Sequence, residues 1–267
     1  MCRLVFVSVV RNPGLYARCV SSNVFNAGAD FVCFDNTRDN VGVAGRYNSF
    51  LDSYDYSKPA WFVFCHEDWE LLEDIRSKLA GLPEDSLYGP IGNATLVTDS
   101  RICSYTRGFC RQCDREGRRR VRCRGLFRTG EVDTFDCQCL IVHSSLVERF
   151  SLRFDGNFTF DLYVEDFCIS AFENHGVISR ILPMDCRHWS YGSVSDRFMR
   201  LKEYLSSKCR GIHSTIAGKS LIARPELVGG RRFTVFGRFF LNHPEKYWLI
   251  ARYGHRQMPY GAGRRQG

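Results

Sequence analysis

The chain has 267 residues, which suffices for one α/β domain with an appendage but is small for two independent domains. Its 44% hydrophobic and 25% charged residues exclude the disordered and fibrous classes. No apolar run approaches the roughly 18 residues of a membrane-spanning helix, and the first ten residues lack the length and cleavage site of a signal peptide. We therefore expect a cytoplasmic protein.

The net charge of +8 is distributed unevenly along the chain. Residues 1–100 carry 8 basic and 13 acidic side chains, and residues 129–196 carry 4 and 11. Ten arginines oppose two acids in 101–128, and 15 basic residues oppose three acids in 197–267. This distribution favours an acidic body that holds a cation, flanked by arginine-rich segments that meet phosphate.

Apolar runs alternate with helical patterns over the first 80 residues, which predicts βαβ units and a mainly parallel sheet. Turn residues such as Pro13 and Gly14 separate the runs. We expect strands at 3–10, 31–34 and 60–65, helices at 15–22, 43–53 and 71–80, and an extended segment at 87–98.

Residues 101–130 interrupt this pattern with arginine, glycine and cysteine, so we expect a surface insertion or a flexible loop there. The pattern returns downstream, with strands at 137–142 and 177–182 and helices at 160–175 and 196–207. Beyond 208 the chain is basic, aromatic and punctuated by glycine, without a clear period. We interpret residues 208–267 as a basic C-terminal extension.

Thirteen cysteines would indicate a disulfide framework in a secreted protein, but their number is odd and no export signal precedes them. We expect most of them to be reduced and buried. One group has a spacing that zinc sites use, although a second Cys-x-x-Cys is missing: Cys103, Cys110, Cys113 and Cys123.

The third expected strand ends in a cluster of side chains that bind metal ions, His66, Glu67 and Asp68. An acidic pair, Glu165 and Asp166, opens a helix downstream, and His188 follows the last expected strand. Because the ends of parallel strands meet at one edge of a sheet, these side chains are expected to converge on one site.

In their order and spacing, several stretches resemble the GT-A glycosyltransferases of family 2. The narrower resemblance is to the StrF-type domain, named after a streptomycin-biosynthesis protein, and it covers roughly residues 3–207. The resemblance implies a GT-A fold over residues 1–207, with 208–267 outside it. The stretches that carry it are 41–48, 61–71, 87–92, 132–143, the acidic pair at 165–166, and 182–192.

The resemblance implies an inverting, metal-dependent glycosyltransferase that moves a sugar from a nucleoside-diphosphate sugar to an unidentified hydroxyl acceptor. A turn cap is an alternative role for Asp35, and a solvated helix surface is an alternative for Arg46. The residues implied in donor binding are Val10, Arg11, Asp35, Arg46, Asn48 and Asp68.

The implied metal ligands are Asp68, His66 and His188, which suit Mn²⁺ or Mg²⁺. His66 stands where the family has an aspartate, and its imidazole favours Mn²⁺. The family draws its catalytic base from the acidic pair, and Asp166 is preferred over Glu165. The implied acceptor side consists of Asp133, Asp136, Trp189 and Tyr191.

Three alternatives stay open. A sugar-1-phosphate nucleotidyltransferase would need a glycine- and lysine-rich loop after the first strand, which residues 11–14 do not supply. A non-catalytic GT-A relative is compatible with the histidine at 66. A protein that binds polyanions or a membrane surface would use residues 101–128 and the basic tail, where aromatic and basic residues alternate.

Overall fold

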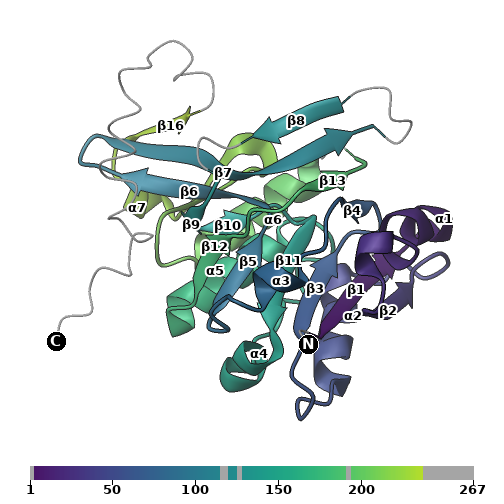
Figure 1. Cartoon of the computed structure of the whole chain (residues 1–267). Helices are drawn as coiled ribbons and strands as arrows, with labels where there is room; N and C mark the ends of the chain where they lie inside the picture. The colour runs from purple at the N-terminus through teal and green to yellow at the C-terminus, as the bar shows by residue number, and fades with distance from the viewer. Residues whose placement is uncertain (1–2, 115–119, 125–127, 191–193, 237–267) are drawn as a thin grey trace.

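The computed structural model describes residues 3–114, 120–124, 128–190 and 194–236, and two large sheets dominate its architecture (Figure 1). Seven strands form the first sheet, five of which run in the same direction. In spatial order they are β2 (Asp30–Asp35), β1 (Leu4–Val10), β3 (Trp61–Cys65), β11 (Cys139–His143), β5 (Ser86–Gly89), β12 (Ile178–Ile181) and β9 (Gly130–Val132).

Helices cover both faces of this sheet, because successive side chains of its central strands point to opposite faces and both sets are apolar. Val5 and Val7 of β1 pack in one core, whereas Leu4 and Phe6 pack in the other. The helical elements are α1 (Pro13–Tyr16), η1 (Ala17–Ser21), η2 (Val24–Asn26), α2 (Val43–Ser53), α3 (Arg76–Leu79), α4 (Ser144–Phe150), α5 (Tyr163–His175), α6 (Asp196–Lys208), η3 (Ala217–Lys219) and α7 (Pro225–Val228).

The predicted fold class, α/β with a mainly parallel sheet flanked by helices, is therefore confirmed. The first core unites α2, α4 and α5 with the sheet, and the second unites α1, η1 and α3 with its other face. None of the helices in the part of the chain described by the structure is long and apolar enough to span a bilayer.

The second sheet is built on one long strand, β7, that corrects the prediction for residues 101–130. Instead of a flexible loop, this segment supplies 13 residues of strand and a partner strand. The strand is buried on both faces, so its sequence shows no alternation. The members are β10 (Thr134–Phe135), β6 (Ile91–Val97), β7 (Arg101–Cys113), β13 (Cys186–His188) and β4 (Trp69–Leu71), with β8 (Arg120–Arg124) and β16 (Arg232–Phe236) also paired to β7.

The geometry of β7 also excludes the zinc site proposed on four cysteines. Cys103 and Cys110 lie seven residues apart on this one strand, which corresponds to roughly 20 Å. Zinc ligands lie about 2.3 Å from their ion. Cys103 therefore cannot share an ion with the Cys110–Cys113 pair, and the side chain of Cys123 lies outside the described residues.

Two helix predictions differ in outcome. The helix predicted at 43–53 coincides with α2, whereas the helix predicted at 71–80 is wrong. Leu71 closes the short strand β4, which pairs with β13, and only Arg76–Leu79 is helical. The strand pairing takes precedence over the helical pattern here, because β4 fills the edge of the second sheet.

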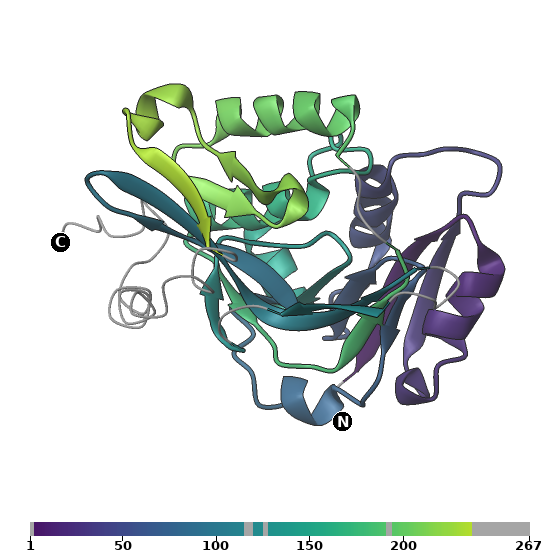
Figure 2. The ribbon, with the colours of Figure 1, turned by 90° about the horizontal axis from the view of Figure 1, so that it is seen from above.

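The segment after residue 207 is part of the folded body as far as the structure describes it. Strands β14 (His213–Thr215) and β15 (Ser220–Ile222) form a hairpin, and β16 pairs with β7 in parallel. Figure 2 shows this hairpin beside α6, on one side of the large sheets. The boundary at 207 stays a prediction, and residues 237–267 of the predicted basic tail lie outside the described residues.

A candidate metal and donor site

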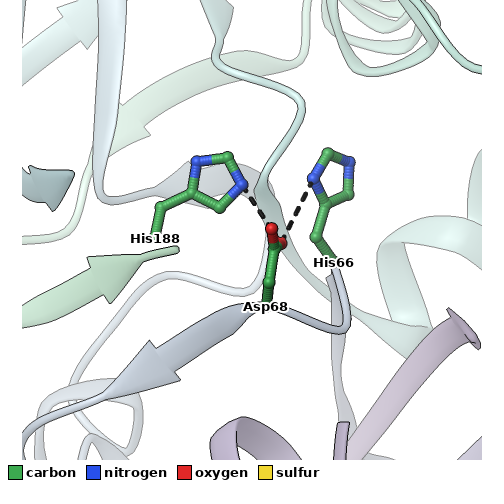
Figure 3. Close-up of side chains that lie close together, drawn as sticks. All are labelled: His66, Asp68 and His188. Atoms are coloured by element: carbon green, nitrogen blue, oxygen red, sulfur yellow. Dashed lines mark ion pairs between the residues drawn. The ribbon is translucent and has the colours of Figure 1, made fainter. Parts of the chain in front are cut away.

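Three candidate metal ligands meet where β3, β4 and β13 come together. His66 directly follows β3, Asp68 directly precedes β4, and His188 ends β13. Their ligand atoms all lie within 4.8 Å of one another, and the side chains point toward a common centre (Figure 3). The Asp68 Oδ1 atom is 3.2 Å from His188 Nε2 and 4.0 Å from His66 Nδ1. The sequence prediction that these residues converge agrees with this arrangement.

Strand pairing fixes the relative positions of Asp68 and His188. The antiparallel pair β4–β13 places Trp69 opposite His188. In addition, the Trp189 backbone N–H donates to the Asp68 carbonyl at 3.0 Å. Both Asp68 and His188 are 6% exposed, so the site lies at the bottom of a depression and not on an open surface.

A hydrogen-bond chain sets the tautomer of His66. The Tyr163 hydroxyl donates to the Cys137 carbonyl at 2.7 Å, so its oxygen is available to accept from His66 Nε2, 3.0 Å away. His66 therefore carries its proton on Nε2, and the lone pair of Nδ1 faces Asp68. A buried polar partner that orients an imidazole in this way is typical of metal-binding histidines.

Burial and charge set the protonation of the three groups. Burial lowers the pKa of His66 to about 4, so this imidazole is neutral at pH 7. Burial by itself would raise the pKa of Asp68, but the hydrogen bond and charge of His188 lower it strongly. Burial would likewise lower the pKa of His188, but its hydrogen bond to Asp68 raises it. Without a cation, His188 and Asp68 thus form an ion pair.

The three ligands line a cleft of about 950 Å³. It opens at the carboxyl ends of β1, β2 and β3, which is where open α/β sheets bind ligands. Residues from many elements contribute to its wall, among them Arg11, Asn12, Asn36, Glu67, Asp136, Glu165, Arg197 and Ala217. Asp68, His66, His188, Arg11, Asp136 and Glu165 are the predicted site residues that the structure brings together here.

Glu165 is the acid of the predicted pair that reaches the cleft. It lies in the first turn of α5 and is fully buried, and its Oε1 accepts from the Thr215 hydroxyl at 2.7 Å. Its Oε2 has no hydrogen-bond partner among the described residues. Burial raises the pKa of Glu165 to about 8, and burial also raises the pKa of Asp136. Such a shifted carboxyl in a cleft is typical of a group that exchanges protons.

Asp166, the residue preferred as catalytic base, points elsewhere. Its Oδ1 lies 2.7 Å from Lys208 Nζ on α6, and Ser170 also donates to it at 3.5 Å. Neighbouring residues on a helix project about 100° apart, so only one acid of the pair can face the cleft. The preference for Asp166 is therefore corrected: this carboxylate ties α5 to α6.

Several residues predicted to bind the donor have structural roles outside the cleft. The Asp35 carboxylate caps a turn, since its Oδ1 accepts from the Thr37 backbone N–H at 2.8 Å. The Asn48 side chain binds both backbone groups of Phe154, at 2.8 and 2.9 Å. Both predictions are corrected, because these polar groups are already bonded away from the cleft wall.

Two further donor predictions fail on direction. Val10 is 2% exposed and packs in the core on the far face of the sheet, whereas Val9 lines the cleft. The Arg46 guanidinium lies 5.8 Å from the centre of the Phe34 ring and is not part of the cleft wall. Of the residues near the first strand's end, Arg11 alone among those predicted reaches the cleft.

The predicted acceptor side is only partly assembled. Asp136 lines the cleft, but Asp133 is buried behind it and accepts a hydrogen bond from Thr95. The indole Nε1 of Trp189 donates to Glu70 at 2.8 Å, and its ring stacks under the Arg18 guanidinium at 4.2 Å. Trp189 thus faces away from the cleft wall, and Tyr191 lies outside the described residues.

Sequence reasoning missed three residues that shape the site. Tyr163 orients His66, Thr215 binds Glu165, and Glu67 accepts from the backbone N–H groups of Arg11 and Asn12 at 2.6 and 2.8 Å. Glu67 thereby holds the loop after β1 against the end of β3. None of these contacts leaves a local pattern, because each joins segments at least 50 residues apart.

Comparisons with known proteins give structural likeness only. Neither protein-family models nor curated proteins match the sequence, so the StrF-type resemblance stays a prediction. GalNAc-T7 solved with UDP, GalNAc and Mn²⁺ gives a TM-score of 0.47 at 8% identity, covering 78% of this chain and 49% of its own. The chain thus spans about half the length of that protein.

Two other solved structures are similar at a lower level. A197 from STIV gives a TM-score of 0.37 at 13% identity, covering 83% of this chain and 94% of its own. The inositol-1-phosphate CTP transferase from T. maritima gives 0.35 at 10% identity, covering 75% and 94%. With all three TM-scores below 0.5, these likenesses assign no family, activity or ligand to this chain.

Proposed function

We propose that this protein is a GT-A-type glycosyltransferase that takes a nucleoside-diphosphate sugar as donor and requires a divalent cation. One observation carries the proposal: three metal-grade ligands meet in a cleft of about 950 Å³ at the carboxyl ends of the parallel strands. A cleft of this size suits a dinucleotide-sized ligand. The resemblance of the sequence to GT-A glycosyltransferases supports the same reading.

The residues present fit a divalent cation. His66 Nδ1 offers a lone pair, Asp68 offers a carboxylate oxygen, and His188 Nε2 becomes a ligand once its proton leaves. Two imidazoles and one carboxylate favour Mn²⁺ over Mg²⁺. A cation bound there would neutralise the diphosphate of the donor and the charge that develops on the leaving nucleoside diphosphate.

The protein's own groups can hold the rest of the donor. The Arg11 side chain lines the cleft next to Asn12 and Asn36, at the ends of β1 and β2. The buried Asn36 Oδ1 has no partner among the described residues, while its Nδ2 donates to the Val41 carbonyl at 2.8 Å. We assign the nucleoside to this end of the cleft and the sugar to the end near Asp136 and Glu165.

Glu165 is the proposed general base. In an inverting transfer, the acceptor oxygen forms a bond to the anomeric carbon while the bond to the diphosphate oxygen breaks, and the acceptor proton moves to a carboxylate. Glu165 Oε2 is unpartnered among the described residues, and the residue lines the cleft, so it is placed to receive that proton. A pKa of about 8 makes the ionised carboxylate a stronger base than an ordinary glutamate.

Calorimetry with the full-length protein tests the proposal. UDP and GDP are titrated with and without Mn²⁺, and the Asp68→Asn variant is the comparison. We expect nucleotide binding that requires Mn²⁺ in the wild type and weakens at least tenfold in the variant. Absence of nucleotide binding by the wild type, or equal binding without Mn²⁺, would contradict the assignment of the cleft.

A further inference from the structure

The hairpin β14–β15 brings a threonine against the proposed base. Thr215 and Glu165 are 50 residues apart in the sequence, yet the Thr215 Oγ1 and Glu165 Oε1 atoms are 2.7 Å apart. Both residues are fully buried. The contact joins the C-terminal part of the described chain to the first turn of α5, so a segment beyond the predicted glycosyltransferase domain reaches the site.

The direction of this hydrogen bond follows from its neighbours. The Ala217 backbone N–H donates to Thr215 Oγ1 at 3.1 Å and occupies one acceptor position of the hydroxyl. An ionised carboxylate can only accept, so the hydroxyl hydrogen of Thr215 points to Glu165 Oε1. This leaves Oε2 as the oxygen without a partner among the described residues, and Glu165 and Ala217 both line the cleft.

The hairpin is held in place from behind, away from the cleft. The Thr134 hydroxyl donates to the Ser214 carbonyl at 2.7 Å, and His213 Nε2 lies 2.9 Å from Glu173 Oε1. Glu173 is two helical turns along α5 from Glu165. Two contacts to one helix thus fix both the position and the rotation of the hairpin strand that carries Thr215.

We propose that Thr215 is a positioning residue for catalysis: it holds the Glu165 carboxyl with its free oxygen toward the acceptor and stabilises its ionised form. The inference rests on the proposed function, in which Glu165 is the base. It makes residues 213–222 a part of the active site, and not an accessory to it.

Other groups around Glu165 oppose its ionisation, so the hydroxyl carries weight. Asp136 and Asp161, from the segments before β11 and α5, raise the pKa of Glu165 beyond the effect of burial, and the Thr215 hydrogen bond lowers it. The remaining titratable groups that face Glu165 are Cys137, Tyr163 and Cys168. Removal of the Thr215 hydroxyl therefore raises the pKa of Glu165 further.

The test compares three variants of the full-length protein: Thr215→Val, Thr215→Ser and Thr134→Val. The last is the matched control, because it removes the same kind of buried hydroxyl from the same hairpin, outside the cleft. The pKa of Glu165 is measured by NMR with ¹³C-labelled glutamate. Hydrolysis of UDP-glucose and UDP-N-acetylglucosamine with Mn²⁺ is followed from pH 5 to 10.

We expect Thr215→Val to raise the pKa of Glu165 by about one pH unit and to lower kcat at pH 7 by about tenfold, with KM unchanged. Thr215→Ser should restore both, and Thr134→Val should change neither. An unchanged pKa and pH profile in Thr215→Val would overturn the inference. So would equal effects of Thr134→Val and Thr215→Val, which would indicate a purely structural role.

The NMR measurement needs no ligand, so it separates this inference from the proposed function. Failure of the wild type to bind any nucleotide contradicts the proposed function and, with it, the catalytic role of Thr215. Should Thr215→Val not fold, the comparison of Thr215→Ser with Thr215→Ala replaces it, with the same expected order. Equal kcat and pKa in that pair would overturn the inference.

Discussion

Replacement of Glu165 by glutamine should make the protein more stable at neutral and alkaline pH, at the expense of activity. Glu165 is fully buried with a single hydrogen bond from the Thr215 side chain, and burial raises its pKa from 4.5 to about 8. Below pH 4.5 the carboxyl is protonated in both the folded and the unfolded state. Above it, the unfolded chain ionises first, so the free energy of unfolding falls until the pH passes about 8.

The size of this effect follows from the difference between the two pKa values, 4.5 and about 8. At about 1.4 kcal/mol per pH unit, the folded state loses roughly 3 kcal/mol by pH 7 and at most roughly 5 kcal/mol by pH 9. Glutamine has the same shape and does not ionise, so Glu165→Gln should not show this loss. Its carbonyl oxygen can still accept from Thr215.

Urea unfolding at pH 5, 7 and 9 measures the effect, with Glu203→Gln on the exposed face of α6 as the control. We expect the stability difference between Glu165→Gln and the wild type to grow by several kcal/mol from pH 5 to pH 9. The control should follow the wild type at every pH. Parallel curves for the wild type and Glu165→Gln would refute the buried, destabilised carboxyl.

Three further predictions concern neighbouring side chains. Tyr163→Phe removes the acceptor that sets the His66 tautomer, so the affinity for Mn²⁺ measured by calorimetry should fall about 10- to 100-fold; unchanged affinity would contradict the tautomer argument. Asp166→Asn should leave hydrolysis of UDP-sugars within a few-fold of the wild type, whereas Glu165→Gln should lower it by about 100-fold or more; the reverse order would restore Asp166 as the base. Lys208→Met leaves the Asp166 carboxylate, 2% exposed, without its cation; thermal unfolding should show a loss of roughly 2–3 kcal/mol after allowance for the partial exposure of Lys208, and an unchanged Tm would show that the pair adds nothing.

The sequence allowed the first sheet and the metal-grade cluster to be predicted, because both depend on local signals. Alternating apolar runs and turn residues marked the parallel strands, and the strand ends carried His66, Asp68 and His188. Strand pairing then brings these ends together without further information, since β4 and β13 are antiparallel neighbours. The prediction needed only that each strand be found.

The choice between Glu165 and Asp166 could not be made from the sequence, because it depends on where α6 docks. Lys208 at the end of α6 takes Asp166, and the other acid is left to face the cleft. The same limit applies to Thr215, which lies in a stretch without a period and acts through a contact across 50 residues. Non-local contacts of this kind leave no trace in spacing or composition.

The strand β7 was missed for a different reason. A half-buried strand shows alternation, but β7 is covered on both faces, and its buried positions include a polar residue as large as Arg107. The Arg107 guanidinium donates to the Thr129 carbonyl at 2.7 Å, which satisfies part of its buried polar surface. An arginine-rich segment therefore forms the centre of a sheet, contrary to its composition.

The location of a bound Mn²⁺ tests the central claim most directly. Crystals grown with Mn²⁺ and UDP, measured for anomalous scattering at the manganese edge, should show one ion about 2.0–2.3 Å from His66 Nδ1, Asp68 Oδ1 and His188 Nε2, with diphosphate oxygens completing its coordination. An ion bound elsewhere, or a nucleotide outside the cleft, would contradict the account.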